Sequence, residues 1–239
     1  FVEMIGHVGF DFVIIDTEEA SADPYGTELE QLIRAAEAAD VIPMVRPADG
    51  SHAILNKSLN AGARALFVPH VVTREQAMSI VSGSRYPPRG VRGAAPIVRA
   101  ARYGALGWND YHREAITEPL VMAMIEDDLA VQNIDDIVAT PGLDGVLVGT
   151  WDLAVDLGVA GGYGPLPAPV LERVERVISA TRARGLYMAA HCWDDTVARK
   201  YVELECQMII ISTDTSLLSN ATRDLKESFD RASNVLGAV

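Results

Sequence analysis

Two carboxylates stand close to the ends of consecutive apolar segments. Glu126 lies near the end of "LVMAMIED", and Asp152 follows the segment "GVLVG" by three residues. Carboxylate oxygens are ligands that Mg²⁺ and Mn²⁺ prefer, and water and substrate can complete the coordination shell. The pair therefore indicates a divalent-metal site. The alternative is that each acid caps the helix after its strand, as acids often do.

An arginine and three acids end two earlier apolar segments. Arg46 ends "IPMVR", and Asp16, Glu18 and Glu19 end "FVIIDTEE". A buried arginine is costly unless an anion meets it, and its guanidinium fork suits a carboxylate or an enolate oxygen. Arg46 is therefore a candidate for binding an anionic substrate. A structural ion pair with Asp16 or Glu18 is the alternative, and both roles can hold together.

The histidines are candidates for proton transfer rather than for zinc binding. The five histidines show no HxH or HExxH spacing, which disfavours a histidine-rich zinc site. His70 and His191 each lie at the end of an apolar segment and could act as an acid or a base near neutral pH, with a structural role as the alternative. No G-x-S-x-G elbow is present, and Cys192 beside His191 makes no catalytic pair by adjacency alone. Nucleophilic hydrolase chemistry therefore has no support.

These side chains can meet only if a sheet brings the ends of their strands together. Short apolar segments typical of buried parallel strands recur at 12–16, 42–46, 65–69, 120–127, 145–149, 186–190 and 208–212. Amphipathic segments of helical length lie at 27–40, 52–63, 74–85, 170–185, 195–205 and 220–236. This alternation of strand and helix predicts an α/β fold with a parallel sheet.

A closed (β/α)8 barrel fits this pattern better than an open sheet. A dinucleotide-binding sheet would carry G-x-G-x-x-G after an early strand, and "IIDTEEA" contains no glycine. The segment "FVEMIGHVG" is expected to be helical, so one further strand before Phe1 would make eight. We therefore expect residues 1–239 to form a single (β/α)8 TIM barrel whose first strand is missing. Active sites in such barrels lie at the carboxyl ends of the strands.

The composition of the chain limits the kinds of partner and the cellular compartment that we expect for the protein. The chain carries a formal charge of −13 and has no run of Lys and Arg to neutralise neighbouring phosphates. No apolar stretch approaches the about 18–20 residues of a membrane span, and the two cysteines suggest no disulfide framework. We expect a cytoplasmic protein with neither a nucleic acid nor a membrane as partner. The segments "RYPPRGVRG" and "GVAGGYGPLPAP" are expected to be loops.

Several segments, taken together and in order, resemble the HpcH/HpaI aldolase family. They are "GFDFVIIDTE", "PMVRP", "AGARALFVPHV", "RYPPRGVRG", "MIED" and "GLDGVLVGTWDLAVDLG". Members of this family are metal-dependent class II aldolases of pyruvate and related 2-oxo acids. The resemblance implies a (β/α)8 barrel whose last helix is exchanged between the partners of a dimer. It also implies a homo-oligomer, commonly a hexamer built from dimers.

The resemblance assigns roles to the residues above. Glu126 and Asp152 match the metal carboxylates, for Mg²⁺, Mn²⁺ or Co²⁺, and Arg46 matches the arginine that steadies the enolate. The implied reaction is retro-aldol cleavage of a 4-hydroxy-2-oxo acid, or its reverse, through a pyruvate-type enolate. A general base must also remove the proton of the 4-hydroxyl group.

The chain departs from the family at the group that transfers this proton. The family motif Asp-x-Glu-His reads "DTEE" here, so Glu19 stands where the family has a histidine paired with the aspartate. We expect Glu19 and Asp16 to act with Arg46 in catalysis. His70 or His191 is the alternative for the proton role.

A second departure lies in the pocket wall. "GTWD" stands where the family usually reads Gly-Pro-x-Asp, so the ring of Trp151 is expected to reshape the pocket or to stack on a substrate. A methionine at 124 stands where a glutamine is common, which makes that wall less polar. The expected substrate-binding residues are Met124, Gly149, Thr150, Trp151, His70 and His191.

Two branches of the same superfamily catalyse other reactions, which are alternatives for this chain. The siderophore-associated citrate synthase joins oxaloacetate to an acetyl thioester, and macrophomate synthase decarboxylates oxaloacetate and uses the enolate to form carbon–carbon bonds. Both share the 2-oxo acid enolate with the aldolases. A third alternative is a catalytically altered barrel that binds a small carboxylate, because Glu19 replaces the usual histidine.

Overall fold

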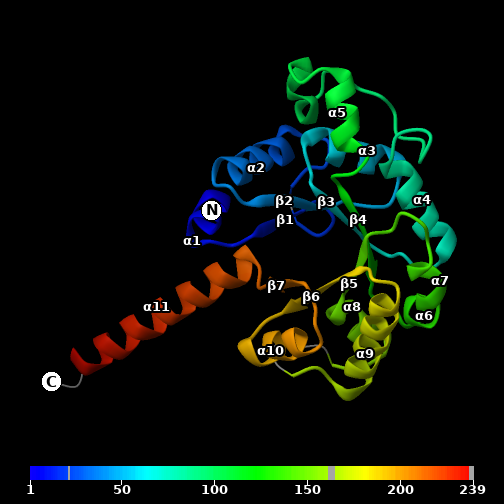
Figure 1. The fold of residues 1–239 in the computed structure, drawn as a ribbon. Helices are drawn as coiled ribbons and strands as arrows, with labels where there is room; N and C mark the ends of the chain where they lie inside the picture. Colours follow the sequence, from blue (N-terminus) through cyan, green and yellow to red (C-terminus); the bar gives the residue numbers. More distant parts are fainter. Residues whose placement is uncertain (21, 161–164, 237–239) are drawn as a thin grey trace.

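A computed structural model describes residues 1–20, 22–160 and 165–236 of the chain. Its centre is a curled seven-stranded sheet, all parallel, whose strands lie in the order of the sequence (Figure 1). The strands are β1 (Phe12–Asp16), β2 (Ile42–Arg46), β3 (Ala65–Val68), β4 (Leu120–Ile125), β5 (Gly145–Val148), β6 (Tyr187–Cys192) and β7 (Met208–Ile211). Every predicted apolar segment therefore forms a strand, and the fold is TIM-barrel-like.

The alternation of side chains along the strands builds two cores. One cluster consists of strand residues alone and fills the inside of the curl: Met44, Ala65, Phe67, Met122, Met124, Leu147 and Ala189. The other cluster joins the opposite face of the strands, such as Leu66 and Val68 of β3, to the helices outside. Since successive side chains of a strand point to opposite faces, a residue two positions beyond an interior residue also faces the interior.

Helices precede, connect and follow the strands. They are α1 (Val2–Val8), α2 (Thr27–Ala38), α3 (His52–Ala61), α4 (Arg74–Ser84), the 3₁₀ helix η1 (Arg99–Gly104), α5 (Trp108–Ala115), α6 (Asp128–Gln132), α7 (Ile134–Val138), α8 (Thr150–Asp156), α9 (Ala168–Ala183), α10 (Asp195–Glu203) and α11 (Asp214–Leu236). The helix expected before the first strand is present as α1. Among the described residues, no helix combines the length and the apolar character that a membrane span requires.

The structure adds helices that the sequence pattern did not predict. The segment between β3 and β4 contains η1 and α5, and α6, α7 and α8 follow β4 and β5. The last helix begins at Asp214 rather than at 220, and it extends away from the sheet (Figure 1). Of the loop expected at 158–169, residues 161–164 lie outside the described part of the chain. An eighth strand, the exchange of α11 and a hexamer stay predictions.

Candidate functional site

Five strand ends bring small or polar residues to the inside of the curled sheet. These residues are Asp16, Arg46, Glu126, Gly149 and His191, each two positions after an interior residue of the same strand. Because all the strands are parallel, their carboxyl ends lie at one end of the sheet. The alternation that builds the inner core therefore also gathers the site.

Arg46 is held by two carboxylates at the ends of β1 and β2. Its Nε and Nη2 atoms donate to the two Asp16 carboxylate oxygens at 2.8 and 2.6 Å, and its Nη1 lies 2.9 Å from a Glu18 oxygen. Burial alone would raise the pKa of Asp16, but Arg46 and the backbone amides of Glu18 and Glu19 hold that pKa below its ordinary value. The structural ion pair expected for Arg46 is thus present. Each terminal nitrogen still has a further N–H for a substrate.

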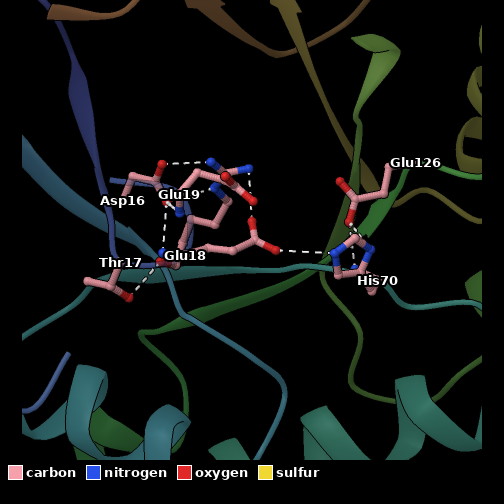
Figure 2. A network of polar contacts seen from close by, with 7 residues as sticks. Asp16, Thr17, Glu18, Glu19, His70 and Glu126 are labelled. Atoms are coloured by element: carbon pink, nitrogen blue, oxygen red, sulfur yellow. Dashed lines mark hydrogen bonds and ion pairs between the residues drawn. The ribbon is translucent and has the colours of Figure 1, made fainter. Parts of the chain in front are cut away.

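His70 joins Glu18 to Glu126. Its Nε2 lies 3.3 Å from a Glu18 oxygen, and its Nδ1 lies 3.1 Å from Oε1 of Glu126 (Figure 2). The His70 backbone N–H donates to the same Glu126 oxygen at 2.6 Å, from a residue in the left-handed region with φ of 55°. Glu18 follows β1 and Glu126 follows β4, and these strands are not neighbours, so His70 bridges the mouth of the sheet.

The Glu18 carboxylate of this network has a raised pKa. Burial raises its pKa to about 7, the charges of Glu126 and Asp16 act in the same direction, and those of Arg46 and His70 oppose them. Near neutral pH the side chain therefore exchanges a proton easily. Such a group can take part in acid–base chemistry.

Glu126 is buried and does not cap the helix that follows it. It is 3% exposed, and the cap of α6 is instead the neighbouring Asp127, whose side chain accepts from the Ala130 N–H at 2.8 Å. Burial raises the pKa of Glu126, and the nearby charge of Asp152 raises it further, while the contacts of His70 lower it. Two carboxylates that repel each other in this way suit a divalent cation.

Gly149 makes room for the Glu126 carboxylate. A Cβ atom at this position would lie 2.7 Å from Cβ of Glu126 and 2.9 Å from its Oε2. Asp152 lies in the first turn of α8, where a negative charge is favourable, but no side chain of the described residues caps this helix, so the capping role expected as the alternative is not observed. In the described ranges, no set of three or more His, Cys, Asp or Glu side chains is arranged to hold a metal. The expected site needs only two protein ligands.

The remaining predicted site residues lie in different surroundings. Met124 is buried inside the curl, Thr150 is buried at the start of α8, and Trp151 is 40% exposed. Glu19 is exposed, and its backbone N–H donates to Asp16 at 3.3 Å. Asp16 itself is paired with Arg46, so the structure shows no hydrogen bond between the Asp16 and Glu19 side chains among the contacts of the described residues.

His191 belongs to an aromatic group that includes one residue the sequence analysis missed. Its ring packs against Trp193, with centroids 4.2 Å apart, and Trp193 in turn lies 6.1 Å from Trp151. The Nε2 atom of His191 is buried without a hydrogen-bond partner among the described residues. Trp193 follows β6 directly, so its place at a strand end was the available signal.

A family of known proteins matches most of the chain. The sequence profile of the HpcH/HpaI aldolase/citrate lyase family matches residues 1–221. The chain belongs to this family. It is accordingly an enzyme of the aldolase and lyase class.

Individual relatives cover nearly the whole chain. A hydroxypyruvate/pyruvate aldolase of Deinococcus radiodurans is 36% identical over 95% of this chain and 80% of its own length. An HpcH/HpaI aldolase/citrate lyase family protein of Burkholderia cenocepacia has a similar structure, with a TM-score of 0.88, 33% identity and coverage of 96% and 89% of the two chains. The citrate synthase SbnG gives a TM-score of 0.84, 32% identity and coverage of 97% and 89%.

Proposed function

We propose that the enzyme cleaves a 4-hydroxy-2-oxo acid into a 2-oxo acid such as pyruvate and an aldehyde, and catalyses the reverse addition. The observation that carries this proposal is the buried Glu126 carboxylate, which lies within electrostatic reach of both Asp152 and Arg46. The similarity to hydroxypyruvate/pyruvate aldolases supports the same reaction.

Glu126 and Asp152 would hold a divalent cation, Mg²⁺, Mn²⁺ or Co²⁺. Such a cation would supply a Lewis acid that stabilises the negative charge developing on the 2-oxo acid. The two carboxylates fit this role because a bound cation would relieve their mutual repulsion. The His70 backbone N–H orients Glu126 through its 2.6 Å hydrogen bond, and Gly149 leaves space beside it.

The protein side chains would bind the substrate and move its protons. Removal of the 4-hydroxyl proton lets the C3–C4 bond break, so that its electron pair forms the enolate and C4 leaves as the aldehyde carbon. Protonation at C3 then gives the 2-oxo acid. Arg46 offers its remaining N–H groups to the enolate oxygen while Asp16 holds the guanidinium in place. We assign the proton transfer to Glu19 with Asp16, and His70 or His191 is the alternative.

The test is pyruvate release from 4-hydroxy-2-oxo acids, measured with a coupled lactate dehydrogenase assay. Release should require Mg²⁺, Mn²⁺ or Co²⁺, stop with EDTA and return with added metal. Glu126→Gln should lower the affinity for Mn²⁺ measured by calorimetry. Turnover that persists unchanged in EDTA would contradict the proposal.

A second candidate reaction follows from the similarity to the citrate synthase SbnG. In a condensation, the enolate of an acetyl thioester would add to the C2 carbonyl of oxaloacetate, and hydrolysis of the thioester would release citrate. In a decarboxylation, oxaloacetate would lose CO₂ to leave the pyruvate enolate, which protonation converts to pyruvate. Incubation with oxaloacetate, with and without acetyl-CoA, distinguishes the candidates by product. Citrate would favour condensation, and pyruvate without citrate would favour decarboxylation.

A further inference from the structure

A row of three aromatic rings lies where β5 and β6 end. The Trp193 ring makes edge contacts with His191 and Trp151, at interplanar angles of 64° and 74°. His191 lies in β6, Trp193 follows that strand, and Trp151 is the second residue of α8 after β5. Because β5 and β6 are hydrogen-bonded neighbours, the row spans two adjacent strand ends.

This row lies beside the groups that would bind the 2-oxo acid. His191 and Arg46 lie near the carboxyl ends of β6 and β2, each two positions after a residue of the inner core, so both face the inside of the curl. The charge of Arg46 also lowers the pKa of His191, in the same direction as burial. At the other end of the row, Trp151 adjoins Asp152 in the first turn of α8. A substrate bound between Arg46 and Asp152 therefore has the aromatic row as a neighbouring wall.

The row can contact only part of the substrate. The 2-oxo acid end is occupied by Arg46 and the metal carboxylates, which leaves the group on C4 to meet the rings. Aromatic faces favour flat or apolar groups. The rings of Trp151 and Trp193 carry no positive charge to pair with a carboxylate, so they disfavour a substrate that ends in a second one.

We propose that Trp193 and Trp151 form the subsite for the aldehyde half of the substrate and select an uncharged aldehyde with a flat aromatic or apolar group over one that ends in a carboxylate. This inference rests on the proposed aldolase function. It adds Trp193 as a residue that determines specificity and names the class of aldehyde that the enzyme accepts.

The test compares benzaldehyde with succinic semialdehyde in aldol addition to pyruvate with Mn²⁺. The wild-type enzyme should have the higher kcat/KM for benzaldehyde. Trp193→Ala should lower kcat/KM for benzaldehyde about tenfold, mainly through KM, and change that for succinic semialdehyde less than about twofold. Trp193→Phe should retain most of the preference, and Trp151→Ala should change it in the same direction as Trp193→Ala.

Two controls separate this inference from the proposed function. Tyr187→Ala removes an exposed ring from the opposite end of β6 and should leave the aldehyde preference unchanged. Exchange of the pyruvate methyl protons in D₂O, followed by NMR, reports enolate formation without an aldehyde, and it should persist in the wild-type enzyme and in Tyr187→Ala. Preference for succinic semialdehyde, or equal losses for both aldehydes, would overturn the subsite while exchange continues. Absence of exchange in the wild-type enzyme would overturn both.

Discussion

Replacing Glu18 by glutamine should make the protein more stable at alkaline pH than at acidic pH, relative to the wild type. The Glu18 side chain is 11% exposed, and it shares the Arg46 guanidinium with Asp16. Burial raises its pKa to about 7, and the charges of Glu126 and Asp16 contribute to the rise. Ionisation of Glu18 thus adds a further negative charge to a buried group of carboxylates.

The sign and the size of the effect on the free energy of unfolding follow from this pKa. The native state holds the Glu18 proton up to a higher pH than the unfolded chain does, so the free energy of unfolding falls as the pH rises from about 4.5 to about 7. The difference between these two values corresponds to at most about 3 kcal/mol. Solvent and salt at the open mouth of the sheet screen the charges, so we expect about 1–2 kcal/mol. Glu18→Gln removes this loss because glutamine does not ionise.

Urea unfolding of both proteins, followed by circular dichroism, measures the effect. The variant should gain about 1–2 kcal/mol over the wild type between about pH 5 and about pH 8. Glu19→Gln is the matched control, since it removes the same charge from an exposed neighbour. Its free energy of unfolding relative to the wild type should differ between the two pH values by less than about 0.5 kcal/mol. A constant offset between Glu18→Gln and the wild type at every pH would refute the raised pKa.

Two further variants test the metal carboxylate and the base. Gly149→Ala places a methyl group 2.7 Å from Cβ of Glu126 and should weaken Mn²⁺ binding at least about tenfold by calorimetry, with pyruvate exchange falling in parallel; unchanged affinity would mean that Glu126 is not a ligand. Glu19→Gln should lower turnover with little change in Mn²⁺ affinity. If turnover is retained, the proton role moves to His70, His191 or water.

The strands were predictable because each one is a short continuous apolar segment. Several helices were not, for a physical reason. The helices α6, α7 and α8 contain only five to seven residues, too few for an apolar face to repeat at helical spacing. The segment from η1 to α5 is irregular, with Arg102 and Tyr103 at positive φ, and it packs through a separate aromatic cluster.

For the site, the sequence by itself determined which side chains lie at the strand ends. Alternation with period two is a local property, so it predicts that Asp16, Arg46 and Glu126 face the same interior. Only the tertiary structure decided their partners. The chain turns at His70 so that this residue reaches both Glu18 and Glu126, although 56 positions separate His70 from Glu126.

The aromatic row and the cap of α6 show the same difference between what the local sequence determines and what the tertiary structure decides. The sequence identified Trp151 as unusual, but the edge contacts of Trp193 with Trp151 and His191 required β5 and β6 to pair side by side. Likewise, the cap of α6 is the acid after Glu126, which leaves Glu126 itself for the interior. Local spacing determines the face on which a side chain lies, whereas the curling of the whole sheet decides which distant side chains it meets.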